Sequence, residues 1–238
     1  MREPLASRPT LRWAVAFFFL ILVAHDLHEL AHTGVGRLIC GAWGPRDFNV
    51  WSLADGCDTW VPTLMGPLLS WSLMWTGLLL TRSTDPARRW TGLALIFAPN
   101  PLGRLLPALV GGGDEGVVAR TLTGTTGALP RALVVLAALV IILPPLVAAW
   151  RTLPVRWRAG WFLLLFAAGI LVTGPLYIVL GNGLLARGVL TAPGILGAPR
   201  LIELASVAAL VGLVFTGRGL LAVPAAGPAP GAGRSEDR

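Results

Sequence analysis

Residues 13–32 read Trp-Ala-Val-Ala-Phe-Phe-Phe-Leu-Ile-Leu-Val-Ala-His-Asp-Leu-His-Glu-Leu-Ala-His, an apolar run that continues into a cluster of ionisable side chains. The run is long enough to cross a bilayer as a helix, which takes about 20 residues. All three histidines of the chain, His25, His28 and His32, fall within it. Because ionisable groups are costly at membrane depth, their presence there indicates a functional site.

The composition of the whole chain is typical of a membrane protein. Hydrophobic residues make up 55% of the 238 residues and charged residues 13%, with a mean hydropathy of +0.71, whereas a soluble domain carries about 25% charged residues. Candidate spans lie at about 12–36, 61–81, from Trp90 onward with proline interruptions, 132–150, 159–181 and 200–222. The sequence predicts an all-α, polytopic membrane protein with about six transmembrane helices, multi-pass in the cell (plasma) membrane.

The basic residues bracket these runs. All of them are arginines, and the net charge of +7 is spread over several loops, which argues against a nucleic-acid partner. Loops 82–89 and 151–158 carry three arginines each. Because arginine-rich loops stay on the cytoplasmic side, six spans predict that both termini are inside. Cys40 and Cys57 flank one loop and form either a disulfide or two free thiols.

The opening stretch ends in His28-Glu29-Leu30-Ala31-His32, an H-E-x-x-H pattern. On a helix that turns about 100° per residue, His28 and His32 lie about 40° and one turn apart, so both imidazoles can reach one ion. Zinc takes imidazole ligands, and Glu29 is displaced around the helix, where it can act as general base on a water molecule. His25 lies about 10 Å from His32 along the axis, too far to share the ion. We expect His25 either to contact the metal ligands without binding the ion itself or to line a pore.

A third metal ligand must come from elsewhere, since the chain has no further histidine. The carboxylates near apolar spans are Asp26, Asp114, Glu115 and Glu203. Asp114 follows a proline-interrupted span and sits among glycines that allow the backbone to approach closely. We therefore expect Asp114 to be the ligand, with Glu115 as the second choice. Arg104, inside the interrupted span, either pairs with a carboxylate or extends to the membrane interface.

With these residues the sequence resembles the site-2 protease family of intramembrane zinc metalloproteases. Besides the H-E-x-x-H pattern, the similar elements are Gly66-Pro67-Leu68-Leu69-Ser70 (the family's G-P-x-x-N/S/G), Asn100-Pro101 and Asp114-Glu115-Gly116 (its Asn/Pro-rich stretch and Asp-Gly motif). The resemblance implies Zn²⁺ as cofactor, a membrane-spanning polypeptide as substrate, and substrate positioning by Gly66, Ser70 and Asn100. It also implies a metal nearer the cytoplasm, whereas the arginine counts place the carboxyl end of the first helix outside.

The chain accordingly divides into four parts. Residues 1–11 are a basic N-terminal segment, 12–120 a metalloprotease-like transmembrane core, 121–222 additional transmembrane helices, and 223–238 a disordered tail rich in Pro, Ala and Gly. Within the core, residues 41–52 permit a short hairpin. Residues 111–130 open with glycines and are expected to be flexible and not lipid-facing.

Three functions are consistent with this site. A zinc endopeptidase would activate water with the ion and Glu29 and would cleave membrane-associated polypeptides. A catalytically inactive regulator of the same fold would bind metal without turnover, and the Glu115 inserted into the Asp-Gly motif gives this function weight. A transporter would relay protons or metal ions through His25, Asp26 and the H-E-x-x-H residues.

Overall fold

The computed structural model describes residues 3–6 and 8–222. Within them, six helical segments are long and apolar enough to cross a membrane, and no strand forms. They are α1 (Leu11–Cys40), α2 (Val61–Thr81), a broken segment Pro86–Thr123, α6 (Ala128–Thr152), Val155–Ala186 and Arg200–Leu221. The prediction of an all-α polytopic membrane protein is confirmed. The tail predicted at 223–238 lies outside the described residues.

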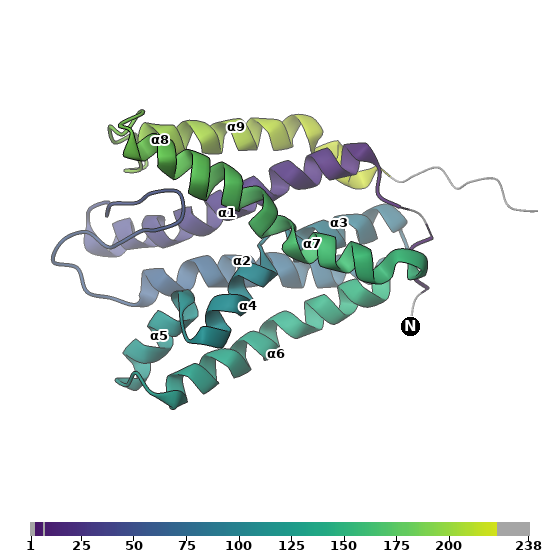
Figure 1. Cartoon of the computed structure of the whole chain (residues 1–238), viewed down its shortest axis with the longest axis horizontal. Coiled ribbons are helices and arrows are strands. Elements are labelled where there is room, and N and C mark those ends of the chain that lie inside the picture. The colour runs from purple at the N-terminus through teal and green to yellow at the C-terminus, as the bar shows by residue number, and fades with distance from the viewer. Residues whose placement is uncertain (1–2, 7, 223–238) are drawn as a thin grey trace, which may run out of the picture.

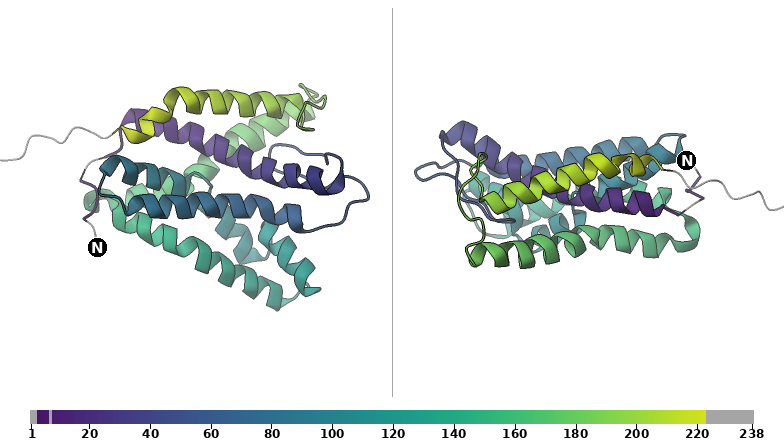
Figure 2. Two further views of the ribbon diagram at one scale, coloured as in Figure 1. Left: turned by 180° about the vertical axis from the view of Figure 1, so that it is seen from behind. Right: turned by 90° about the horizontal axis from the view of Figure 1, so that it is seen from above.

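α1 is central to the bundle. α9 (Arg200–Thr216) runs along one side of it and α2 along the other, and α6 packs beyond α2 (Figure 1). α7 (Arg158–Thr173) crosses α1 and α3 and continues through a π-helical segment, η2 (Gly174–Gly181), into the short α8 (Asn182–Ala186). The last turn, η3 (Gly217–Leu221), returns to the end of the bundle where α1 begins (Figure 2).

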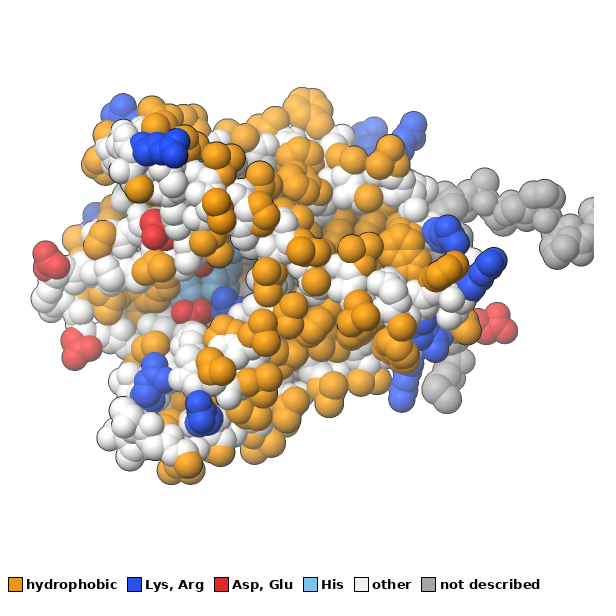
Figure 3. Space-filling model, viewed as in Figure 1, with side chains coloured by type: hydrophobic (Ala, Val, Ile, Leu, Met, Phe, Trp, Pro, Cys, Tyr) orange, Lys and Arg blue, Asp and Glu red, His pale blue; other side chains and the backbone are white. Residues whose placement is uncertain are grey.

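The outer surface of the bundle is apolar over most of its length. Outward-pointing side chains on the later helices include Leu136, Leu163, Val179 and Phe215, which are 60%, 64%, 71% and 82% exposed. Blue arginine side chains gather at the end where α1 begins, beyond the apolar surface (Figure 3). Continuous apolar exposure of this kind suits lipid and not water.

α1 is fixed at both ends and along its buried face. Thr10 caps it by accepting a hydrogen bond from the Trp13 N–H at 3.1 Å, and Gly41 ends it with a left-handed φ of 76°. The Trp13 indole donates to the carbonyl of Trp90 at 3.2 Å, and both side chains are almost fully buried. The helix therefore extends four residues beyond the predicted boundary at 36, to Cys40.

α2 and α3 (Pro86–Phe97) approach closely where two glycines face each other. A Cβ atom on Gly77 would lie 2.5 Å from the carbonyl oxygen of Gly92, and one on Gly92 would lie 2.7 Å from that of Gly77. Small residues at a membrane-helix interface permit this approach. The contact fixes α2 in the bundle, and α2 carries Gly66 and Ser70 beside α1.

The third span breaks at two points into α3, α4 (Pro101–Val110) and α5 (Gly113–Thr123). The first break is at Asn100, which has a left-handed φ of 57° and caps α4 by accepting from the Gly103 N–H at 3.0 Å. A residue that precedes proline avoids the helical conformation, so the chain turns before Pro101. The second break is at Gly111, whose φ of 77° ends α4. These two breaks set the position of α5.

Two predictions for this span are wrong. The helix begins at Pro86 and not at Trp90, because the Asp85 carboxylate accepts from the Ala87 N–H at 2.9 Å and caps it. Residues 113–123 form a helix and not a flexible loop. Asp114 and Glu115 lie in its first turn, where the helix dipole favours acidic side chains.

The segment 41–60 between α1 and α2 is cross-linked by a disulfide between Cys40 and Cys57, whose Cα atoms are 5.6 Å apart. Of the hairpin permitted at 41–52, a single bridge forms, between Arg46 and Trp51. The segment lies at the end of the bundle opposite the beginning of α1 (Figure 1). Disulfides persist in oxidising compartments and arginine-rich loops stay in the cytoplasm, so both features favour the same orientation, with 41–60 outside the cytoplasm.

We therefore expect the two native cysteines to be accessible from the non-cytoplasmic side. After reduction of intact cells, a membrane-impermeant maleimide should label Cys40 and Cys57 without permeabilisation. The matched control is Thr84→Cys in a chain whose native cysteines are replaced by serine, because Thr84 is exposed in the turn between α2 and α3 at the other end. That cysteine should be labelled only after permeabilisation. Labelling of Thr84→Cys without permeabilisation, with Cys40 and Cys57 labelled only after it, would contradict the placement of segment 41–60 outside the cytoplasm.

Candidate metal centre

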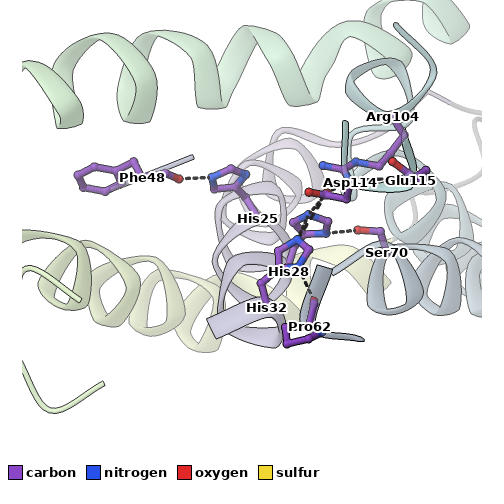
Figure 4. A network of polar contacts seen from close by, with 9 residues as sticks. All are labelled: His25, His28, His32, Phe48, Pro62, Ser70, Arg104, Asp114 and Glu115. Atoms are coloured by element: carbon purple, nitrogen blue, oxygen red, sulfur yellow. Dashed lines mark hydrogen bonds and ion pairs between the residues drawn. The ribbon is translucent and has the colours of Figure 1, made fainter. Parts of the chain in front are cut away.

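Two histidines of α1 and one aspartate of α5 converge inside the bundle. The Nε2 atoms of His28 and His32 are 3.1 Å apart, and Oδ2 of Asp114 lies 3.4 Å and 3.5 Å from them (Figure 4). The imidazoles are buried, whereas the Asp114 side chain is 22% exposed. Among the described residues, these three form a group that can hold a metal ion.

The triangle of ligand atoms has the size of a tetrahedral coordination shell. Zinc binds nitrogen and oxygen at about 2.0–2.1 Å, so two ligand atoms of a tetrahedral ion lie about 3.3 Å apart. The observed separations of 3.1, 3.4 and 3.5 Å are close to that value. An ion at the centre would have three protein ligands and one open position, the arrangement of catalytic zinc sites.

Hydrogen bonds behind the imidazoles orient them. Nδ1 of His32 lies 2.8 Å from the carbonyl oxygen of Pro62. A carbonyl only accepts, so Nδ1 carries the proton and Nε2 keeps its lone pair for an ion. Nδ1 of His28 lies 2.9 Å from the Ser70 hydroxyl, which can hold this ring in the same tautomer. Two lone pairs that face each other at this distance repel unless a cation lies between them.

Gly66 on α2 makes room for the histidine pair. A Cβ atom at Gly66 would overlap Nε2 of His32 and would lie 2.6 Å from Cε1 of His28. One helical turn further on, the buried Ser70 makes its hydrogen bond to His28. The resemblance assigned Gly66 and Ser70 to substrate positioning. The structure places both against the histidines, a role that the sequence did not predict.

Asn100 and His25 lie apart from the three converging atoms. Asn100 caps α4, and its side chain packs where Gly169 of α7 leaves space. His25 donates from Nε2 to the carbonyl oxygen of Phe48 at 2.8 Å (Figure 4). In the part of the chain that the structure describes, no hydrogen bond joins His25 to His28 or His32. His25 therefore anchors segment 41–60 to α1.

Segment 41–60 also covers one of the histidines. The Trp51 ring stacks on His32, with centroids 4.6 Å apart and planes 16° from parallel. Phe48 is buried, and its N–H donates to Asn182 Oδ1 at 3.1 Å. The sequence predicted neither Trp51 nor the Pro62 carbonyl as part of the site. A tryptophan in a loop is only weak evidence of a functional site in a sequence. A backbone carbonyl gives no such evidence, because every residue has one.

Arg104 on α4 contacts the same carboxylate oxygen that faces the histidines. Its Nη1 lies 2.7 Å from Oδ2 of Asp114 and 3.8 Å from Oε1 of Glu115 (Figure 4). Of the two alternatives for Arg104, pairing with a carboxylate is therefore the one observed. Glu115 faces Arg104 and is not among the three converging groups, so the structure favours Asp114 over Glu115 as the third ligand.

The buried charges near this centre do not balance. Glu29 is 5% exposed, and its Oε2 has no hydrogen-bond partner among the described residues. Counted as ionised, Glu29, Asp114 and Glu115 contribute −3 and Arg104 contributes +1, which leaves −2. Unpaired charge is costly inside a low-dielectric bundle. One divalent cation would restore neutrality.

A second charge pair near α1 leaves this balance unchanged. Asp26 accepts from the Tyr177 hydroxyl at 3.0 Å, and Arg46 from segment 41–60 interacts electrostatically with Asp26 and Glu29. Burial lowers the pKa of the Arg46 guanidinium, and the two carboxylates oppose that change. When Asp26 and Arg46 are added to the groups counted above, all as ionised, the formal sum stays at −2.

The chain matches no protein-family model, no curated protein and no solved structure. The resemblance to site-2 proteases therefore rests on short sequence motifs alone. The H-E-x-x-H histidines and Asp114 meet at one point, and the Gly66–Ser70 element packs against them. Asn100 remains outside this cluster, at the start of α4.

Gly66→Ala should remove most of the bound metal, because the added methyl group overlaps Nε2 of His32 and pushes against Cε1 of His28, so that both rings must move. Metal content per chain, measured by inductively coupled plasma mass spectrometry on purified protein, should fall from about one towards zero. Gly34→Ala in α1 is the matched control, since a Cβ atom there meets nothing within 4 Å. A Gly66→Ala protein with unchanged metal content would show that the histidines do not bind the ion as described.

Ser70→Ala should weaken metal binding without abolishing it. Loss of the hydrogen bond behind His28 should cost roughly 10–100-fold in metal affinity, the usual effect of removing a group that orients a ligand. Competition with a chelator of known affinity measures this change. Ser72→Ala serves as control, because Ser72 is exposed on the same helix and its hydroxyl donates to the Leu68 carbonyl, away from His28. Equal affinities for the two variants would contradict the role of Ser70.

Proposed function

We propose that the protein is an intramembrane zinc metallopeptidase that cleaves membrane-spanning polypeptides. The observation that carries this proposal is the triangle of two imidazole nitrogens and one carboxylate oxygen at tetrahedral separations, on a helix that also bears Glu29. Two nitrogen donors and one oxygen donor suit zinc, and three protein ligands leave a position for chemistry. The apolar exterior and the six long helices support a site within the membrane.

Each group near the site has a part in the proposed reaction. A zinc ion held by His28, His32 and Asp114 would polarise a peptide carbonyl and lower the pKa of water. Glu29 directly follows His28, about 100° around α1. Its carboxylate would accept a proton as the water oxygen bonds to the carbonyl carbon, and would deliver that proton to the amine as the C–N bond breaks. Arg104 would hold the Asp114 carboxylate in its ligating position.

The candidate metal centre can be reached from the surface of the bundle. Figure 3 shows a hollow on one face of the bundle in which histidine and acidic side chains are visible between apolar ones. The Asp114 side chain is 22% exposed. A substrate helix must unwind to present a carbonyl, since its carbonyls are otherwise hydrogen-bonded. The breaks at Asn100 and Gly111 leave irregular backbone near the site, which the membrane tolerates where it lines a cavity.

The orientation proposed above sets where the substrate would be cut. His32 is eight residues from the end of α1 at Cys40, which is about 12 Å along the helix axis. With segment 41–60 outside the cytoplasm, the scissile bond would lie in the non-cytoplasmic half of the bilayer. This differs from the cytoplasmic position that the family resemblance implies.

Glu29→Gln should stop cleavage and leave the metal in place. In lipid nanodiscs with a model transmembrane polypeptide, the cleavage rate should fall by roughly 10²–10⁴-fold, the usual contribution of a general base. Zinc content should not change, because Glu29 is not among the converging ligand atoms. Asp85→Asn is the control: it removes an exposed carboxylate at the opposite end of α2, and asparagine still caps α3. Mass spectrometry of the fragments measures both rates.

Several outcomes separate this function from its alternatives. Chelation should stop cleavage by the wild-type protein, and added zinc should restore it. Wild-type protein that binds one zinc ion but cleaves no transmembrane polypeptide would support the inactive regulator. Zinc flux into proteoliposomes without cleavage would support a transporter. Cleavage that survives Glu29→Gln would overturn the peptidase mechanism.

A further inference from the structure

A large cavity lies far from the metal centre, at the end of the bundle where α1 begins. Its volume is about 710 Å³, and it lies between the final turns of α2 and α6. Four arginines line it: Arg82, Arg89, Arg151 and Arg158. No acidic side chain is among its described lining residues. The cavity therefore has a strongly positive wall that the metal site does not use.

Two of these arginines are well placed to bind an anion. Arg82 and Arg151 are exposed, and neither makes an ion pair with an acidic side chain in the described part of the chain. Arg158 is half-buried and lies 5.9 Å over the Trp150 ring. Arg89 is buried and donates to the Glu3 carbonyl at 2.7 Å, so it adds positive charge as part of the wall.

The remaining wall of the cavity is apolar. Leu78 and Trp75 line it from α2, and Leu143 and Val147 from α6. Trp75, Leu143 and Val147 are also 41%, 50% and 37% exposed on the outer surface. These positions belong to segments that are apolar enough to span the membrane. A ligand that fills the cavity must therefore combine an anionic group with an apolar chain.

We propose that this cavity binds the phosphate headgroup of an anionic phospholipid, with an acyl chain against α2 and α6. Guanidinium groups match phosphate through paired, charge-assisted hydrogen bonds. Basic pockets between transmembrane helices on the cytoplasmic side are suited to anionic headgroups, and the arginine-rich end is the side we assign to the cytoplasm. Inorganic phosphate shares the headgroup chemistry but cannot use the apolar wall. The proposal is independent of the metal centre.

Native mass spectrometry of the full chain tests this site. Protein exchanged into nanodiscs of phosphatidylglycerol mixed with phosphatidylcholine should retain phosphatidylglycerol preferentially. The double variant Arg82→Gln/Arg151→Gln should lower that retention by about 25-fold, since each arginine near the membrane surface contributes about fivefold. Arg187→Gln/Arg200→Gln is the matched control, because it removes two exposed arginines from the opposite end. It should retain the lipid as the wild type does.

Three results would overturn the proposal. Equal retention of the two lipids by the wild type would remove the anionic preference. Equal losses in both double variants would show a general effect of charge and not this cavity. Displacement of the lipid by millimolar inorganic phosphate would show that the apolar wall contributes nothing and that the cavity is a simple anion site. Folding of each variant is checked by its thermal unfolding midpoint in the same nanodiscs.

Discussion

Two imidazole nitrogens and one carboxylate oxygen face one another at 3.1–3.5 Å inside a helical bundle with an apolar exterior. Without a cation, this arrangement brings lone pairs together. With Glu29, Asp114 and Glu115 counted as ionised against Arg104, it also leaves a formal charge of −2 in a medium of low dielectric constant. A single divalent ion removes both costs. The other features around the site act to hold these three atoms in place.

Each support comes from a different element, so the site depends on the whole arrangement of α1, α2, α4 and α5. On α2, the Ser70 hydroxyl bonds to His28 and the Pro62 carbonyl bonds to His32. Gly66, which has no side chain, leaves space for both rings. α4 contributes Arg104, which holds the Asp114 carboxylate. The disulfide-closed segment 41–60 adds Trp51 over His32. The contact between Gly77 of α2 and Gly92 of α3 holds α2 in the bundle, where its residues contact the two histidines.

The sequence predicted the parts of this site that follow from helical spacing. His28 and His32 are four residues apart on a long apolar helix, and that spacing alone places both imidazoles toward one ion. Asp114 was expected from its place after a proline-broken span, and the structure brings it to the histidines. The helix at 113–123 was missed because its glycines suggested a loop, whereas Gly111 ends one helix and the acidic pair begins the next. The Pro62 carbonyl and the Trp51 stack depend on tertiary packing, which no local pattern encodes.

X-ray absorption spectroscopy at the zinc edge, on the full chain purified without chelators, tests the central claim most directly. The account predicts about one zinc ion per chain, with four nitrogen or oxygen ligands near 2.0 Å and the scattering of two imidazole rings. A spectrum with sulfur ligands, with no imidazole scattering, or with no bound metal at all would contradict the His28, His32 and Asp114 site.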